Sequence, residues 1–215
     1  MKKYSELIKR VIILCIGLII AHLGVTLFLL ADIGADPFNV LIQGLFRTIS
    51  GAVKWGFITH GRVHVAISIL IIVALLFIDK SYIKIGTLIC MSCGGPIIDF
   101  FNWILAPLFT DGMGIVAKVI VNILGCCILA FGMTIVIKSE AGTGPNDLVA
   151  VVISDKIKKK FSIIRIIVDV CFAAAGFVLG GTIGLGTVIC AFVVGPVAGI
   201  FMPINEAWIK KVCGK

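Results

Sequence analysis

Six long, almost uncharged apolar runs are spaced along the chain, and polar segments separate them. The runs cover residues 11–31, 63–78, 85–108, 115–137, 161–179 and 183–204. A helix of about 20 residues crosses the ~30 Å hydrocarbon core of a bilayer, and a run as short as 63–78 can cross it where the bilayer thins locally. The pattern therefore predicts an all-helical membrane protein with six transmembrane helices.

The second half of the chain repeats the first. Residues of the first run and of the segment after it recur 108 positions later: Gly17 and Gly125, Gly24 and Gly132, Thr26 and Thr134, Gly34 and Gly142, Pro37 and Pro145. The third and sixth runs share short motifs 100 positions apart: Gly86-Thr87 and Gly186-Thr187, Gly95-Pro96 and Gly195-Pro196. Glycine and proline suit special backbone positions, so we expect the residues of these motifs to lie at helix-packing positions.

Each half contains three predicted spans, which is an odd number, so the two halves must face opposite ways across the bilayer. Inverted repeats of this kind underlie many secondary transporters. The expected organisation is a cytoplasmic N-terminus over residues 1–10, a first membrane repeat over 11–108, a second over 115–204 and a cytoplasmic tail over 205–215. A duplicated membrane scaffold without a transported ligand is the alternative interpretation.

Two polar elbows follow the first and fourth runs, at residues 31–41 and 139–149. Their structural residues are glycines that end one helix and prolines that begin the next: Gly34, Pro37, Gly142, Gly144 and Pro145. The apolar stretch after each elbow is too short to span, so we expect a short helix that either re-enters the bilayer or lies at its surface. A re-entrant helix would point its positive amino end at the centre of the protein, where it could hold an anion.

Four polar residues of the elbows are therefore candidate substrate or ion contacts: Asp36, Asn39, Asn146 and Asp147. Ordinary helix capping is the other explanation for the same residues.

These elbows, with the Gly-Thr and Gly-Pro motifs downstream, resemble the YczE/YitT-like family of bacterial integral membrane proteins from about residue 11 to residue 204. The usual elbow of that family resembles Gly-x-Gly-Pro-aromatic-Asp-x-Leu. Here Asp36 replaces a glycine, Asn39 replaces the aspartate and Asn146 takes the aromatic place. The resemblance implies the fold and a bacterial membrane location. Because YitT-type members carry a soluble domain after the membrane part and this chain stops at Lys215, we expect it to be closer to the YczE type.

Several ionisable residues fall inside the predicted spans, where charges usually face the bundle interior or water. Arg165 and Asp169 are four residues apart on one helix face, and they either form a structural pair or line a pathway. Asp99 has no partner nearby in the sequence and is the preferred proton or cation site. His22 is either a neutral histidine bonded across helices or a proton relay.

The cysteines and the remaining histidines do not indicate a metal or redox centre. Most of the eight cysteines lie in apolar runs, where free thiols behave as small hydrophobic side chains. The pair Cys90 and Cys93 has no second pair or histidine nearby. His60 and His64 are two ligands at the start of the second span, and two ligands do not make a metal site. We expect no metal and no cofactor.

The composition limits both the class of protein and its location. The 215 residues are 60% apolar and 14% charged, whereas soluble domains are about 45–50% apolar and about 25% charged. These values exclude a secreted enzyme, a nucleic-acid-binding domain and a disordered chain. The first run is also too long for the core of a cleavable signal peptide.

The positive charges predict the orientation of the chain. If the N-terminus lies on the cytoplasmic side of the membrane, only four of the 19 lysines and arginines fall on the outer side: Arg47, Lys54, Arg62 and Lys118. Basic residues are retained in the cytoplasm, so both termini are expected there, in a bacterial plasma membrane. The basic run 156–160 would hold this orientation near anionic headgroups.

No arrangement of residues typical of an enzyme is present in the sequence. The preferred hypothesis is a small-solute secondary transporter with a central site between the repeats. A non-transporting accessory protein that supports a partner complex is the alternative, and a passive channel is disfavoured because the helices lack a polar stripe. The expected partners are the lipid bilayer, a small-molecule or ion substrate, and either a second copy or a membrane partner, with no nucleic acid.

Overall fold

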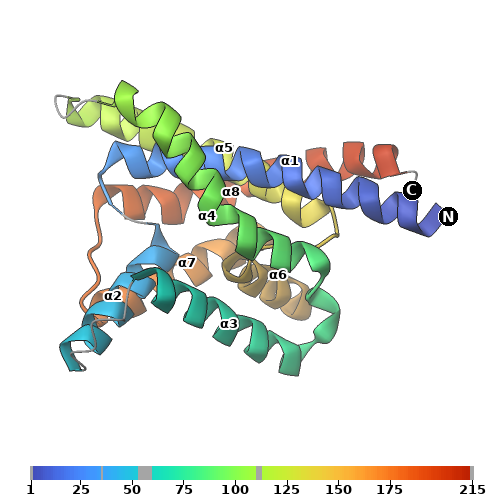
Figure 1. The fold of residues 1–215 in the computed structure, drawn as a ribbon, viewed down its shortest axis with the longest axis horizontal. Coiled ribbons are helices and arrows are strands. Elements are labelled where there is room, and N and C mark those ends of the chain that lie inside the picture. The colour runs from blue at the N-terminus through green and yellow to red at the C-terminus, as the bar shows by residue number, and fades with distance from the viewer. Residues whose placement is uncertain (1, 35, 53–59, 110–112, 214–215) are drawn as a thin grey trace.

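The computed structural model describes residues 2–34, 36–52, 60–109 and 113–213, and every regular element in these ranges is helical. Figure 1 shows the arrangement. The elements in chain order are α1 (Lys2–Ala31), α2 (Pro37–Ala52), α3 (His60–Ile78), η1 (Lys80–Tyr82), α4 (Ile85–Leu105), η2 (Ala106–Leu108), α5 (Ile115–Lys138), α6 (Pro145–Ile157), α7 (Phe161–Val178) and α8 (Leu185–Cys213). The prediction of an all-helical protein is confirmed.

Five helical segments of the described chain are long and apolar enough to cross a membrane. They are Glu6–Ala31, Ile85–Leu108, Ile115–Lys138, Phe161–Val178 and Leu185–Cys213. The other predicted span, Val63–Ile78, lies in α3 and is shorter. Large apolar side chains on these helices are exposed, for example Phe77 (87%) and Trp103 (77%), as suits a surface in contact with lipid tails. A count of six transmembrane helices stays a prediction.

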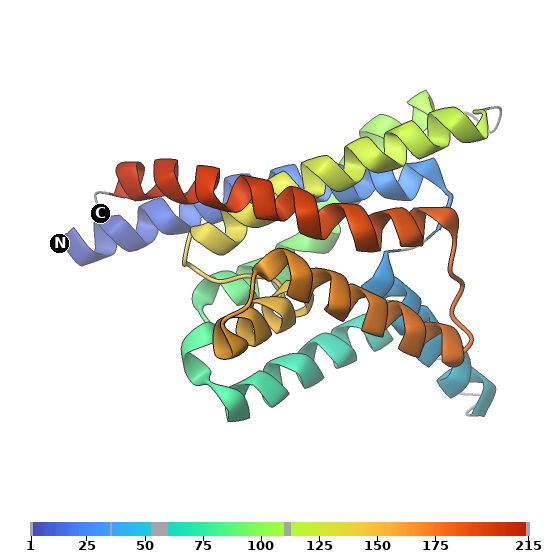
Figure 2. The ribbon, with the colours of Figure 1, turned by 180° about the vertical axis from the view of Figure 1, so that it is seen from behind.

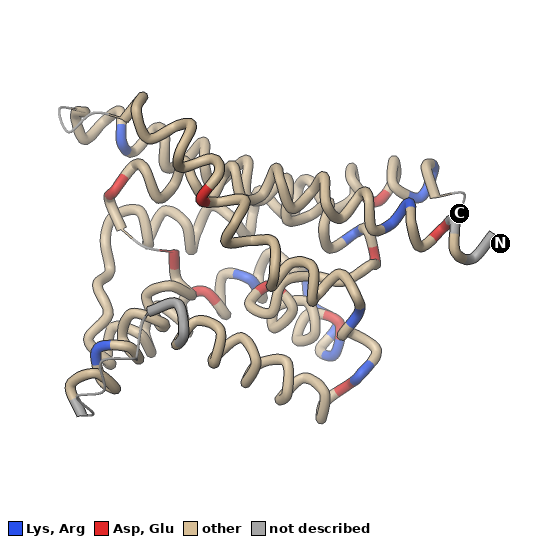
Figure 3. The backbone as a smooth tube through the Cα atoms, viewed as in Figure 1, with Lys and Arg blue, Asp and Glu red and all other residues tan. Residues whose placement is uncertain are grey.

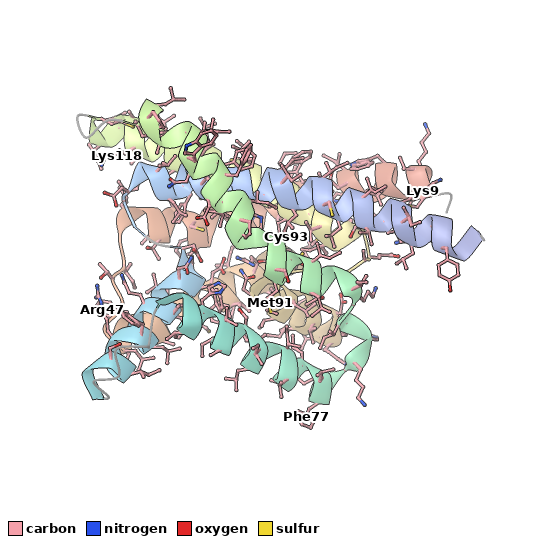
Figure 4. All side chains as sticks on the ribbon, in the orientation of Figure 1. Lys9, Arg47, Phe77, Met91, Cys93 and Lys118 are labelled. Carbon is pink, nitrogen blue, oxygen red and sulfur yellow. The ribbon has the colours of Figure 1, made fainter. Side chains whose placement is uncertain are left out.

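The long helices α1 and α5 run antiparallel, α8 lies beside α5, and α4 crosses α1 (Figures 1 and 2). The helices α2, α3, α6 and α7 lie on one side of this group. Both termini lie at one end of the molecule, which we call the terminal end. Lys9 lies toward the terminal end, whereas Arg47 and Lys118 lie at the opposite end (Figure 4).

This distribution agrees with the expected sorting of basic residues, although the orientation in a membrane stays a prediction. Lys54, and the side chains of Lys2, Lys3 and Arg62, lie outside the described part of the chain.

The glycines of the first repeat motif let α1 and α5 touch backbone to backbone. A Cβ atom added at Gly24 would lie 2.3 Å from the Leu129 nitrogen, and one added at Gly132 would lie 2.2 Å from the Ala21 nitrogen. Real Cβ atoms do not approach this closely, so each of these glycines is required by the contact. Small residues at such positions allow close packing of membrane helices.

The backbone conformations of the two elbows match. Asp32 and Glu140, which are 108 residues apart, both have positive φ, 49° and 57°. Gly34 and Gly142 have φ values of 145° and 140°. This region of φ is open to glycine and strained for other residues, which explains why the glycine recurs in both elbows.

The two elbows also make matching contacts. The Gly186 N–H donates to the Ile33 carbonyl (2.8 Å), and the Gly86 N–H donates to the Ala141 carbonyl (2.9 Å). Ile33 and Ala141 are 108 residues apart, and Gly86 and Gly186 are 100 apart. The Gly-Thr motifs therefore begin α4 and α8 against the elbow of the opposite half. Thr87 and Thr187 are both buried at these positions.

The Gly-Pro motifs, by contrast, are not equivalent. A Cβ at Gly195 would lie 2.6 Å from the Ser162 carbonyl oxygen, whereas a Cβ at Gly95 would meet nothing within 4 Å. Next to this motif of α4 the buried glycine is Gly94, where a Cβ would lie 2.7 Å from His22 Nε2. The prediction of helix packing at Gly95 is therefore wrong, because the face of α4 that meets α1 carries Gly94. The prolines that follow, Pro96 and Pro196, are both exposed inside their helices.

Candidate functional site

A buried ion network joins α6 to α7. Arg165 donates from Nε to Asp169 Oδ2 (2.9 Å) and from Nη1 to Asp147 Oδ1. The side chains of Arg165 and Asp169 are only 7% and 1% exposed, and that of Asp147 is 19% exposed. The pair predicted within α7 is thus present, and the structure adds Asp147 as a third member.

Local sequence places Asp147 at this point. Gly144 precedes α6 in an extended conformation and Pro145 begins the helix, as the fixed φ of proline favours. Asp147 then lies in the first turn, where the positive amino end of the helix stabilises a carboxylate. Asn146, next to it, is partly exposed, and a Cβ at Gly144 would lie 3.2 Å from its Oδ1.

The first elbow uses its carboxylate differently. Asp36 accepts hydrogen bonds from the N–H groups of Phe38 and Asn39, both at 3.1 Å, and from the side-chain amide of Asn39. Asp36 therefore caps α2, which begins at the buried Pro37. Its carboxylate occupies the amide groups at this helix end, as the capping alternative predicts, and a role of Asp36 and Asn39 as substrate or ion contacts stays a prediction.

The two elbows converge on the same region. Asp36 and Asp147 each lie close enough to Asp169 for their charges to act on it. Figure 3 shows acidic and basic positions together in the middle of the molecule, away from the charges at its two ends. Three carboxylates and one guanidinium in this region leave an excess of negative charge. Such a centre suits a proton or a cation better than an anion.

His22 lies beside this network without joining it through a hydrogen bond among the described residues. Its Nδ1 is 2.8 Å from the Leu18 carbonyl oxygen one turn earlier, so this nitrogen carries the proton when the ring is neutral. Its Nε2 faces Gly94 of α4, and the charge of Asp147 acts on the ring. This position is compatible with either role predicted for His22.

Asp99, the preferred ionisable candidate from the sequence, lies elsewhere. It is exposed on α4 and has no hydrogen bond or ion pair in the part of the chain that the structure describes. The structure therefore does not bring Asp99 to the network around Arg165. Asp99 has no charged partner nearby in the sequence. That absence does not indicate a position at the centre of the protein.

No group of three metal-ligating side chains occurs in the described ranges, and all eight cysteines are free thiols. Cys90 is buried in α4 and Cys93 is exposed (Figure 4). The His64 ring packs edge-on against Phe38, with ring centroids 5.3 Å apart. The side chain of His60 lies outside the described part of the chain.

A pocket of about 440 Å³ lies beside the second elbow, and the start of α4 and the end of α5 in its wall lie toward the terminal end (Figure 1). Its walls combine residues of η1, the start of α4, the end of α5, the elbow and α6: Ser81, Tyr82, Lys84, Ile137, Glu140, Gly142, Thr143, Leu148 and Val151. Thr143 is buried, and its Oγ1 has no hydrogen-bond partner among the described residues. The glycines and proline of this elbow are evident from the sequence, whereas Thr143 was not among the predicted site residues.

Polar contacts define the rim of this pocket. The Lys84 ammonium donates to the Glu140 carbonyl oxygen (2.8 Å), and the Tyr82 hydroxyl donates to Asp155 Oδ2 (3.2 Å). Burial raises the pKa of Tyr82, and the nearby charge of Asp155 raises it further. The tyrosine therefore stays a neutral donor at physiological pH.

The comparisons with known proteins cover nearly the whole chain. Residues 8–203 match the family of unknown function DUF6198. The uncharacterised membrane protein YczE of Bacillus subtilis is 28% identical over 200 residues, which is 93% of this chain and 88% of YczE. An uncharacterised protein of Haemophilus influenzae is 26% identical over 199 residues, covering 91% and 84% of the two chains. The uncharacterised YyaS of Bacillus subtilis is 26% identical over 192 residues, covering 89% and 91%. No solved structure matches the chain.

Proposed function

The chain belongs to the DUF6198 family, as its resemblance to YczE-like membrane proteins predicted, and from this premise we propose that it is a small-solute secondary transporter. It is a membrane protein by its apolar helices and by its relative YczE. In the proposed mechanism its two halves are inverted repeats that rock against each other, so that a central site opens to each side of the membrane in turn. Both termini lie in the cytoplasm, and the membrane is the bacterial plasma membrane.

The matching elbows support this arrangement. The positive φ values of Gly34 and Gly142 and the hydrogen bonds of Ile33 and Ala141 recur in both halves. Helices α2 and α6 each begin after an elbow, at or beside the residues whose charges act on Asp169. Short helices that begin near a shared centre are the usual construction of transporter sites.

One observation carries the proposal: the network of Asp147, Arg165 and Asp169 is buried between α6 and α7. An unpaired charge at mid-bilayer costs about 2.5–3.5 kcal/mol on insertion scales. Replacing a buried ion pair by well-packed apolar residues is often neutral or even stabilising, so stability alone does not explain such a network. A role in binding a proton, a cation or the solute explains why charges are placed there.

The experiment is a flux assay in proteoliposomes. The full-length protein is reconstituted with an internal pH dye, and amino acids, organic acids, polyamines and sugars are added under proton or sodium gradients. Wild-type protein should show ion-coupled flux with at least one of these solutes. Asp169→Asn should abolish the flux, whereas Asp99→Asn, which changes an exposed and unpaired carboxylate, should retain it.

Absence of flux with every solute, together with stable co-purification of a fixed membrane partner, would contradict transport. That result would favour the accessory role. If the Asp169→Asn protein still shows flux, the protein is a transporter but the network takes no part in its mechanism.

A further inference from the structure

Two contacts between short and long helices occupy related places in the two halves, and they are built differently. In the first, α2 meets α7 through backbone atoms. A Cβ added at Gly44 would lie 2.3 Å from the Gly176 oxygen, and one added at Gly176 would lie 2.5 Å from the Val40 oxygen. A Cβ at Gly181 would lie 2.4 Å from the same oxygen. We call the contact of Val40, Gly44, Gly176 and Gly181 the glycine seam.

Hydrogen bonds fasten the glycine seam at its edge. Thr48 Oγ1 donates to the Leu179 carbonyl oxygen (2.9 Å), and Arg47 Nη1 donates to the Gly180 carbonyl oxygen (2.6 Å). All four of these residues belong to α2 or to the end of α7 and its exit. Separation of α2 from α7 would break these bonds and would expose the backbone that the glycines bury.

The second contact joins α6 to α3 through side chains. Leu148 and Val152 stand 108 residues after Val40 and Gly44, and they cluster with Leu75 of α3. We call this cluster of Leu75, Leu148 and Val152 the aliphatic seam. Val152 takes the place of Gly44 and Leu148 that of Val40, so a branched side chain stands where the glycine seam has bare backbone.

Like the hydrogen bonds at the edge of the glycine seam, the contacts that fasten the aliphatic seam at its rim are exposed. They are the Tyr82–Asp155 hydrogen bond (3.2 Å) and the Lys156–Asp79 ion pair (3.3 Å). Exposed ion pairs are screened by water and add little stability. Aliphatic side chains can also repack when helices slide, because their contacts are non-directional.

The pocket of about 440 Å³ lies beside the aliphatic seam, since Leu148 and Tyr82 are part of its wall. The buried Thr143 hydroxyl, which has no partner among the described residues, also belongs to that wall. A pocket of this volume suits a small molecule, and an unsatisfied hydroxyl provides a polar group for it.

We propose that the aliphatic seam is the mobile gate of the protein and that the pocket beside it is the passage by which a small polar solute reaches the centre from the terminal end. The glycine seam closes the opposite end in this structure. The inference rests on the proposed transport function. It further specifies the end to which the protein opens at rest and names Thr143 as a contact for the solute. Because glycines stand in one seam and aliphatic residues in the other, the sequence itself favours the state that opens toward the terminal end.

The first test measures access to the pocket. A cysteine-free, full-length protein carrying Thr143→Cys is labelled with a membrane-impermeant thiol reagent in vesicles of each orientation. Labelling should occur from the terminal end. Gly176→Ala inserts a Cβ into the glycine seam and should shift the protein away from this state, slowing labelling about tenfold for a modest change in the equilibrium.

The matched control is Gly51→Ala on α2, the other helix of the glycine seam, where a Cβ would meet nothing within 4 Å. This variant should label at the unmodified rate. Equal labelling rates in folded Gly176→Ala and Gly51→Ala proteins, or labelling of Thr143→Cys from the other side only, would overturn the assignment.

A second measurement needs no substitution and covers the case in which Gly176→Ala fails to fold. In hydrogen exchange on the wild-type protein, backbone amides of α3 and α6 should exchange faster than those of α2 and α7 at the glycine seam. The reverse order would overturn the inference. If the labelling and exchange results hold while no solute gives flux, the seam assignment stands and the transport proposal fails.

Discussion

The two elbows follow one backbone path and carry different chemistry. Both place a glycine at positive φ, and both receive a hydrogen bond from the start of a helix in the other half. Asp36 of the first elbow caps its own helix, whereas Asp147 of the second reaches Arg165 on α7. The comparison teaches that glycine and proline keep the backbone of a repeat constant while its polar side chains diverge.

The same division extends to the helices that follow the elbows. Gly44 of the glycine seam and Val152 of the aliphatic seam stand at the same place in their halves, and they give one close contact and one looser one. Charge and side-chain volume therefore distinguish two elbows, and the helices that follow them, although the elbow backbones agree. Substitutions made in pairs, one in each half, can separate these contributions.

The largest difference between the elbows is expected from their charged residues. Arg165→Ala leaves two carboxylates without their partner and should lower the free energy of unfolding by about 3–5 kcal/mol. Asp36→Ala removes only a helix cap and should cost about 1 kcal/mol. Both values can be measured by denaturant unfolding in detergent. Similar losses in the two variants would contradict the distinction between a network and a cap.

Substitution of the elbow glycines tests the backbone conformation that the two elbows share. Gly34→Ala and Gly142→Ala each force an alanine into a conformation that suits glycine, and each places a Cβ within 3 Å of a neighbour. Each variant should lose about 2–4 kcal/mol. The same unfolding assay checks this expectation. A large loss in one elbow and none in the other would show that the two backbones are not equivalent in energy.

The Gly-Pro motifs of α4 and α8 give a smaller contrast. Gly195→Ala would place a Cβ 2.6 Å from the Ser162 oxygen and should cost about 1–3 kcal/mol. Gly95→Ala meets open space and should stabilise the helix by about 0.5–1 kcal/mol. Thermal unfolding monitored by fluorescence can rank the two variants against wild type. Loss of stability in Gly95→Ala would mean that this face of α4 is covered by something else.

The smallest effect on stability is expected from a substitution of Asp79, at the rim of the aliphatic seam, where the two halves meet. Bonds from Ser81 and Lys156 lower the pKa of Asp79 below its ordinary value of 3.8. Its stabilising effect is therefore present above the unfolded-state pKa and is lost as the pH falls through the lower folded-state pKa. Asp79→Asn should therefore lower the stability slightly near neutrality, and the difference from wild type should disappear as the pH falls below ~4. A loss of stability confined to low pH would contradict this assignment.

Local features of the sequence were sufficient for much of the fold. The elbows follow from glycine and proline, and the Arg165–Asp169 pair follows from the spacing of one helical turn. The third member of the network, Asp147, lies 18 residues from Arg165. Their contact depends on how α6 packs against α7, and no local rule indicates that.

The errors have the same cause. Asp99 was preferred as an ion site because it lies in a predicted span without a partner, and Gly95 was expected to pack because its motif recurs, but the rotation of α4 about its axis leaves both exposed. That rotation is set by packing, with Gly94 against His22. The sequence shows Thr143 only as a hydroxyl beside the glycines of its elbow. Its burial depends on packing against residues of the opposite half, which no local pattern indicates.

The central claim is that the two halves are inserted upside down relative to each other, so that equivalent positions of the elbows face opposite sides of the membrane. Asp32 and Glu140 are exposed, equivalent residues on which it can be tested. In a cysteine-free protein, Asp32→Cys and Glu140→Cys are each treated with an impermeant thiol reagent in right-side-out and inside-out vesicles. The account predicts that Asp32→Cys reacts only from the outside and Glu140→Cys only from the cytoplasmic side, and reaction of both from the same side would contradict it.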